Sequence, residues 1–262
     1  MISKEIQNVS FLQFPNFEPF AAIRHAIFTR RGGSSRGAFG SLNISFGVGD
    51  KHTDVLKNRK LIARCLESER LVFVQQVHGS DVLILKNGES ENDAALISET
   101  PQTADALITD IAGLNLVIQV ADCQPVLLYE PVRNVIANVH SGWRGSVLNI
   151  IADVVKIMER RFGGQAENMI AGVGPSLGPC CAEFVNYRQE LPESFWKYRI
   201  GQNHFDFQAI SKHQLIEAGV LEANISLSRI CTRCNLDRFY SYRGEKVTGR
   251  FAAVIGLQEA RI

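Results

Sequence analysis

The chain has 262 residues, a formal net charge of +1, 45% hydrophobic residues and 21% charged residues. This composition is that of an ordinary globular protein, and the near-neutral charge excludes strong attraction to nucleic acid or to an anionic membrane. The N-terminus lacks the basic start and apolar run of a signal peptide, and the apolar runs are too short to span a bilayer. We therefore expect a cytoplasmic protein that binds neither nucleic acid nor membranes.

Apolar periodicity predicts strands and helices along most of the chain. A helix is expected over 50–67, with Asp50 and Thr53 as cap candidates, and a longer one over 146–162, ending at Gly163. A third is expected over 207–218. Strands are expected at 71–77, 114–120, 126–129, 135–139 and 170–173. Residues 239–242 and 251–257 are expected to pair as a hairpin across the turn 243–249, and the polar stretch 86–103 as an exposed loop.

These elements follow one another without an internal repeat or a linker, which predicts a single domain over residues 1–262. Some neighbouring strands are close enough in sequence for hairpins, and others are separated by a helix. The pattern predicts an α+β (mixed α/β) fold in which helices pack on mixed β-sheets, not a purely parallel doubly wound sheet.

Three potential metal ligands follow three of the predicted strands. These are His78, Cys123 and His140, and each lies near a turn residue. Two imidazoles and a thiolate suit zinc, and three protein ligands leave a fourth position for water or substrate. Taken singly, such residues are more often hydrogen-bonded histidines and small core cysteines, so spacing alone leaves both interpretations open.

Two arginines are candidates for anion binding. Arg59 lies on the apolar stripe of the first predicted helix, where a guanidinium needs an anionic partner. A bound substrate anion or an internal carboxylate would be such a partner, and a side chain that reaches outward to water would need none. Arg144 precedes a predicted helix and is either an anion contact or an exposed loop residue. Asp122 either orients a metal-binding histidine or forms a turn.

Several longer motifs occur in a fixed order. They are Gln76-Val77-His78-Gly79, Thr103-Ala104-Asp105-Ala106, Ala121-Asp122-Cys123, His140-Ser141-Gly142-Trp143-Arg144-Gly145, Gly174-Pro175 with Cys180-Cys181, and Thr248-Gly249-Arg250. In this order they resemble the laccase-domain family of purine nucleoside phosphorylases, also catalogued as polyphenol oxidases, over about residues 29–257. The chain also resembles, more distantly, a group of Cys–His hydrolases related to bacterial deamidating toxins, which implies a cysteine-hydrolase-type fold.

The resemblance implies one zinc ion per chain, held by His78, Cys123 and His140, with copper as the alternative ion. It implies phosphorolysis of adenosine, inosine, guanosine and methylthioadenosine, together with adenosine deamination. The expected partners are a small nucleoside and phosphate, and the expected assembly is a monomer or a homodimer. Asn58-Arg59 matches a family position implicated in phosphate binding. Asn43, in the family motif Ser41-Leu42-Asn43, would orient substrate or a metal ligand, unless it caps a turn.

Three other functions remain open at this point. A multicopper oxidase needs more histidines than the six present, which makes copper-dependent polyphenol oxidation the weaker reading. A metal-free hydrolase would use Cys123 as nucleophile with His140 or His78 as base, for instance to edit an amide of a peptidoglycan precursor. A binding protein would use the same pocket without turnover. The CxxC pair Cys231 and Cys234 lacks the second half of a zinc site and is interpreted as packing.

Overall fold

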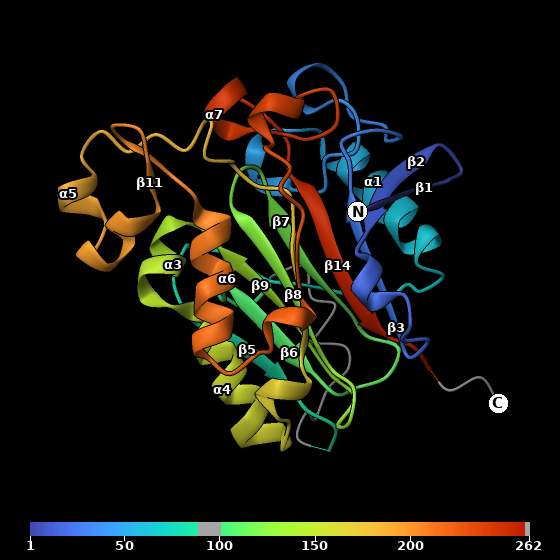
Figure 1. The fold of residues 1–262 in the computed structure, drawn as a ribbon. Coiled ribbons are helices and arrows are strands. Elements are labelled where there is room, and N and C mark those ends of the chain that lie inside the picture. Colours follow the sequence, from blue (N-terminus) through green and yellow to red (C-terminus); the bar gives the residue numbers. More distant parts are fainter. Residues whose placement is uncertain (89–100, 260–262) are drawn as a thin grey trace.

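The computed structural model describes residues 1–88 and 101–259, and these form two mixed sheets with helices on the outer faces (Figure 1). The first sheet has the order β1 (Ile2–Ile6), β2 (Val9–Gln13), β3 (Ile23–Phe28), β14 (Phe251–Leu257), β7 (Asn115–Val120) and β4 (Leu71–Phe73). The second has the order β13 (Ile225–Leu227), β10 (Ile170–Val173), β8 (Gln124–Glu130), β9 (Val135–Ser141), β6 (Ala106–Thr109) and β5 (Val82–Leu85). A separate ribbon joins β11 (Arg199–Ile200) and β12 (His204–Phe205).

The helices cover the two sheets from outside. They are α1 (His52–Cys65), α3 (Trp143–Leu148), α4 (Ile150–Phe162), α5 (Tyr187–Glu190), α6 (Phe207–Glu217) and α7 (Tyr242–Glu245). Figure 1 shows α3, α4 and α6 together on one side of the molecule and α1 on the other. None of these helices combines the length and the apolar character that a membrane span requires.

Successive side chains of a central strand point to opposite faces of its sheet, and this alternation shows which layers pack on each face. In β14, Ala253 and Ile255 belong to the core between the sheets, whereas Ala252 and Val254 pack with Ile62 of α1. Strands that are buried on both faces read as continuous apolar runs, and this is why β14 has no polar side chain. The order of layers is therefore α1, first sheet, second sheet, and α4 with α6.

The predicted fold class is confirmed, and the structure corrects two of the predicted helices. The expected helix over 146–162 is interrupted at Asn149, whose left-handed backbone (φ 60°) ends α3 and whose side chain accepts a hydrogen bond from the N–H of Ala152 to begin α4. Helix α1 begins after Lys51, without a side-chain cap. The cap candidate Asp50 instead accepts hydrogen bonds from Ser35 and Asn43.

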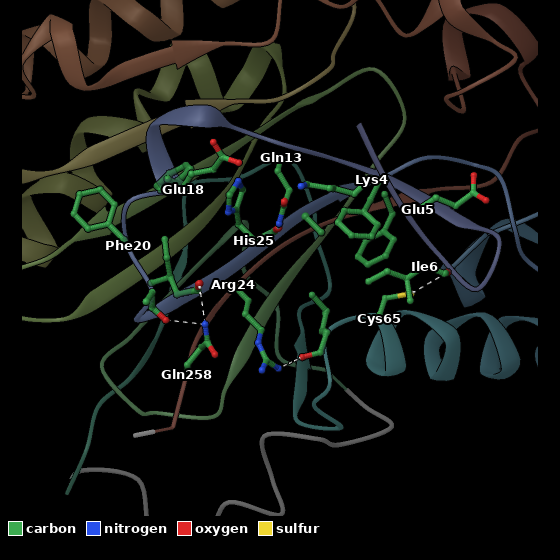
Figure 2. A pocket seen from close by; sticks show the side chains of 17 residues that line it. Lys4, Glu5, Ile6, Gln13, Glu18, Phe20, Arg24, His25, Cys65 and Gln258 are labelled. Carbon is green, nitrogen blue, oxygen red and sulfur yellow. Dashed lines mark hydrogen bonds between the residues drawn. The ribbon is translucent and has the colours of Figure 1, made fainter. Parts of the chain in front are cut away.

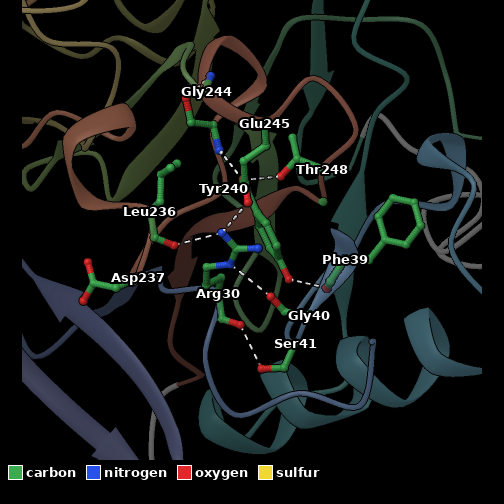
Figure 3. Close-up of polar contacts among 12 residues, drawn as sticks. Arg30, Phe39, Gly40, Ser41, Leu236, Asp237, Tyr240, Gly244, Glu245 and Thr248 are labelled. Carbon is green, nitrogen blue, oxygen red and sulfur yellow. Dashed lines mark hydrogen bonds and ion pairs between the residues drawn. The ribbon is translucent and has the colours of Figure 1, made fainter. Parts of the chain in front are cut away.

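The predicted hairpin near the C-terminus is wrong. β14 pairs with β3 and β7, and residues 239–242 do not form a strand. Tyr240 is instead fully buried, donates its hydroxyl hydrogen to the carbonyl of Phe39, and lies 4.4 Å from the guanidinium of Arg30 (Figure 3). Arg30 also donates to the carbonyls of Gly40 and Leu236 and pairs with Glu245 at 2.9 Å. This network holds the loop 236–241 and α7 against the N-terminal segment. Most of the expected loop 86–103 lies outside the described residues.

Candidate active site

The structure brings together the three predicted ligands, which we name the His–Cys–His group (His78, Cys123 and His140). Their ligand atoms all lie within 4.8 Å of one another, and the two imidazole rings are 4.9 Å apart, nearly perpendicular. Only Cys123 lies where the sequence placed it, between two strands. His140 is inside β9, and β4 ends at Phe73, well before His78. The convergence therefore depends on the loop 74–79 as much as on the strand ends.

A buried carboxylate orients His140. Asp105 has no exposed surface, and its Oδ1 lies 2.7 Å from Nδ1 of His140. A carboxylate accepts hydrogen bonds, so Nδ1 is the protonated nitrogen and Nε2 is left to face Cys123 and His78. An orienting role was one of the two possibilities for Asp122, but Asp105 makes that contact in the structure. Asp122 accepts hydrogen bonds from Thr232 and from the N–H of Arg243 instead.

The same carboxylate holds the loop that carries His78. Three consecutive N–H groups, those of Val77, His78 and Gly79, donate to Asp105 at 3.2, 3.0 and 2.7 Å. His78 adopts a left-handed backbone (φ 60°), which is uncommon for a residue other than glycine. Asp105 thus positions both histidines, although the motif that contains it gave no sign of this role.

Gly142 leaves the space that the group needs. A Cβ atom at this position would lie 3.0 Å from Sγ of Cys123 and 3.1 Å from a ring carbon of His78. Both distances are shorter than ordinary contacts, so a side chain at Gly142 would displace the ligands. Steric crowding by Cys123 and His78 therefore explains why the third position of the His140-Ser141-Gly142 motif is a glycine.

The electrostatics of the group favour a charged pair when no metal is bound. Burial raises the pKa of Cys123, but His140 and His78 outweigh this effect and lower it to about 6 from an ordinary value of 9.0. Burial lowers the pKa of His140, but Cys123 and Asp105 outweigh it and raise it to about 9. Two imidazole nitrogens and one thiolate within reach of a common point fit a zinc ion with one open coordination position.

The group lies in a cavity of about 920 Å³. Its lining includes the aromatic side chains Phe46, Trp143, Phe184, Phe207 and Tyr242. It also includes four arginines, namely Arg59, Arg144, Arg243 and Arg250. Among the described lining residues the only carboxylate is that of Asp122, and both of its oxygens accept hydrogen bonds from the protein. The cavity therefore suits a ligand with a flat ring and an anionic group.

Arg59 is the arginine with the most restricted position. Its guanidinium lies 3.7 Å from the ring centre of Phe73 and 4.2 Å from that of Phe46, and its Nε donates to the carbonyl of Ile44. Burial lowers its pKa to about 10. No carboxylate of the described residues forms an ion pair with it. Of the alternatives for Arg59, an internal carboxylate partner therefore has no support among the described residues.

The other predicted site residues differ in position. Arg144 is exposed, lies 4.7 Å from the ring centre of Trp143, and lines the cavity. Asn43 is completely buried and is not part of the lining. Its side chain donates to Asp50 and accepts from the backbone N–H of Arg250. Asn43 therefore fixes the backbone of an arginine that lines the cavity, without lining the cavity itself. The motif Thr248-Gly249-Arg250 does not by itself predict a role for Arg250 in the cavity.

A second hollow, of about 440 Å³, lies between the N-terminal strands and the end of α1 (Figure 2). It also contains a histidine and a cysteine, His25 and Cys65. Burial lowers the pKa of His25 to about 4 and raises that of Cys65. Among the described residues, no group of three metal-ligating side chains gathers here.

Residues 24–258 match the family described as multi-copper polyphenol oxidoreductase laccase. A protein of Geobacillus stearothermophilus named purine nucleoside phosphorylase YlmD is 34% identical over 253 residues, which cover 92% of each chain. A protein of an unknown prokaryotic organism named adenosine deaminase RL5 is 31% identical, over 83% of this chain and 87% of its own. The crystal structure of YlmD from Geobacillus stearothermophilus resembles the present fold with a TM-score of 0.86 at 32% identity, over 98% of both chains.

Proposed function

The chain belongs to the multi-copper polyphenol oxidoreductase laccase family, and we propose that it is a zinc-dependent purine nucleoside phosphorylase that also deaminates adenosine. The observation that carries the proposal is the position of Arg59. It presents a largely buried guanidinium without a carboxylate partner, in the same cavity as the His–Cys–His group. A phosphate would supply the missing negative charge, and a guanidinium can bind two of its oxygens at once.

The cavity walls suit the rest of the substrate. The aromatic side chains offer flat apolar surfaces on which a purine can stack, and Arg144 and Arg250 extend the positive potential beyond Arg59. Relatives named purine nucleoside phosphorylase and adenosine deaminase support nucleosides as the substrate class. The expected substrates are adenosine, inosine, guanosine and methylthioadenosine.

The His–Cys–His group would hold the metal. When bound, zinc supplies a Lewis acid with an open position beside the substrate. The protein's own residues prepare that position. Asp105 keeps the proton of His140 on Nδ1, so that Nε2 is available as a ligand, and Gly142 allows Cys123 and His78 to approach each other.

Multicopper chemistry does not fit the residues present. Within the described part of the chain, the His–Cys–His group is the only gathering of potential ligands that contains histidine. None of the three methionines, Met1, Met158 and Met169, lines the cavity, so none is placed as an axial ligand to the group. The site therefore has neither the second copper centre nor the weak axial thioether of such oxidases.

The test identifies the products formed from adenosine, with and without phosphate. Arg59→Gln is expected to raise the phosphate requirement about 10- to 100-fold, because a charged hydrogen bond contributes roughly 1.5–3 kcal/mol. Deamination should be less affected. Arg64→Gln, on the exposed end of the same helix, is the matched control. Equal loss of both activities in Arg59→Gln would show that Arg59 does not bind phosphate.

One observation favours a second candidate, a cysteine hydrolase acting on an amide. Cys123, His140 and Asp105 form a thiolate, an imidazolium and an orienting carboxylate, which is the arrangement that a nucleophilic thiol needs. The two functions separate on metal removal. Turnover that survives a chelator and is abolished by alkylation of Cys123 supports the hydrolase, and turnover restored by zinc after chelation supports the phosphorylase.

A further inference from the structure

Four cysteines from two distant segments meet outside the cavity. We name Cys180, Cys181, Cys231 and Cys234 the four-cysteine cluster. Their sulfur atoms all lie within 4.8 Å of one another, and Cys234 lies 3.5 Å from Cys180 and 3.6 Å from Cys181. None of the four lines the cavity of the His–Cys–His group. Cys180 and Cys181 thus supply the two further thiols that the CxxC pair, Cys231 and Cys234, would need to form a four-cysteine metal site.

The distances match metal coordination and not a disulfide. All four cysteines are free, and the measured separations far exceed the S–S bond of about 2.0 Å. In a tetrahedral site with zinc–sulfur bonds of about 2.3 Å, neighbouring sulfurs are roughly 3.8 Å apart. Separations of 3.5 and 3.6 Å differ from that value by only a few tenths of an ångström.

The backbone around the cluster is built to bring the sulfurs together. A Cβ atom at Gly178 would lie 2.9 Å from Cβ of Cys231, so only glycine fits there. Asn235 donates to the carbonyl of Cys231 and stabilises the CxxC turn.

We propose that the four-cysteine cluster binds a structural zinc ion. Four thiolates fill the tetrahedral coordination of zinc and leave no position for substrate, which is the closed pattern of a structural site. Cys180 and Cys234 are exposed and give the ion a path into the site, whereas Cys181 and Cys231 are buried.

The ion would join two segments that form part of the cavity wall. One segment carries Leu177 and Ala182, and the other carries Tyr242 and Arg243, all of which line the cavity. The segments already meet through a β-bridge between Ser176 and Cys231. The zinc would therefore hold a wall of the cavity in place while taking no part in turnover.

The test measures metal in protein purified under reducing conditions without added copper. Wild-type protein is expected to contain two equivalents of zinc, and Cys231→Ser one. Cys65→Ser removes a thiol that lies outside both groups and should retain two. If the His–Cys–His group binds no metal, wild-type falls to one and Cys231→Ser to none, so the two proposals fail separately.

Cobalt identifies the ligands. In the Cys123→Ala background one equivalent of Co²⁺ should give the absorption of a tetrahedral four-thiolate centre, and the further change Cys231→Ser should remove it. A readout that needs no variant is alkylation of the wild-type protein. The zinc-loaded cluster should protect its four cysteines, and chelation should expose them. Absence of the cobalt spectrum, equal alkylation in both states, or a native disulfide between Cys180 and Cys234 would overturn the proposal.

Discussion

The two hollows of this protein each contain a histidine and a cysteine, but their chemical environments are opposite. In the hollow of Figure 2, His25 accepts a hydrogen bond from the N–H of Phe14 and lies against aromatic rings, and Cys65 is near a backbone carbonyl. Burial is the main influence on both, so it lowers the pKa of His25 and raises that of Cys65. Both groups are therefore neutral near pH 7.

In the larger cavity the same two residue types carry charge. His140 is as buried as His25, with 3% against 5% of its surface exposed. Its pKa nevertheless rises, because Asp105 and the Cys123 thiolate favour the protonated ring more than burial disfavours it. The contrast teaches that a buried histidine marks a functional site only when anions converge on it. Each prediction below tests one side of this contrast.

The largest expected difference is in thiol reactivity. In metal-free protein, alkylation of Cys123 should rise with pH to half its maximum near pH 6, because only the thiolate reacts and its pKa is about 6. Cys65, whose pKa is raised, should react only above pH 9. Because each pH unit is a factor of ten, the thiolate fractions at pH 7 should differ by about a hundredfold or more. Peptide mass spectrometry after timed alkylation measures both rates, and matching profiles would break the comparison.

The second prediction concerns stability in acid. The pKa of His25 is about 4 in the folded protein and 6.5 in the unfolded chain, so between these values the unfolded chain binds a proton that the folded protein does not. The contribution of His25 is therefore fully present above pH 6.5 and is lost as pH falls to about 4. The loss in the free energy of unfolding is about 3 kcal/mol.

The variant His25→Gln should lose less stability than wild-type protein between pH 6.5 and 4, because its amide can accept from Phe14 without titrating. Denaturant unfolding at several pH values measures this difference. His213→Gln, at a histidine on α6 whose side chain is 41% exposed, is the control for removal of a histidine as such. Parallel pH profiles for His25→Gln and wild-type would show that burial does not dominate at His25.

The sequence predicts a site residue when its role follows from its residue type and its local position in the chain. Residue type and a nearby turn made His78, Cys123 and His140 candidates for zinc, and the family resemblance of the motifs around them selected these three residues. Asp105 was missed because its role arises from a tertiary contact. A parallel bridge between Gln75 and Thr103 places residues 77–79 beside Asp105, and nothing local in the sequence reveals that register.

The two cysteine pairs show the same limit. Cys231 and Cys234 were interpreted as packing because two thiols are too few to hold a zinc ion. The other two thiols, Cys180 and Cys181, come from a loop that is distant in sequence. The hairpin failed for a related reason. Residues 239–242 have strand-forming side chains, but burial of Tyr240 beneath Arg30 fixes 239–241 as a loop that leads into α7 (Figure 3). Local propensity predicts elements, and contacts between distant segments decide their partners.

The smallest expected effect comes from removing the negative charge of Asp105 while keeping an oxygen that accepts from Nδ1 of His140. The amide oxygen of Asp105→Asn can still accept from Nδ1 of His140, but the negative charge is lost, and the amide nitrogen cannot accept from the N–H groups of Val77 and Gly79. Zinc affinity at the His–Cys–His group should fall about 10- to 100-fold, as is typical when a partner of a metal-binding histidine is changed. Competition with a chromophoric chelator measures it. Asp122→Asn, which contacts neither histidine, should retain more of the affinity. If the two variants lose equal affinity, the orienting carboxylate has been misassigned, and burial without anionic convergence would be enough to explain both hollows.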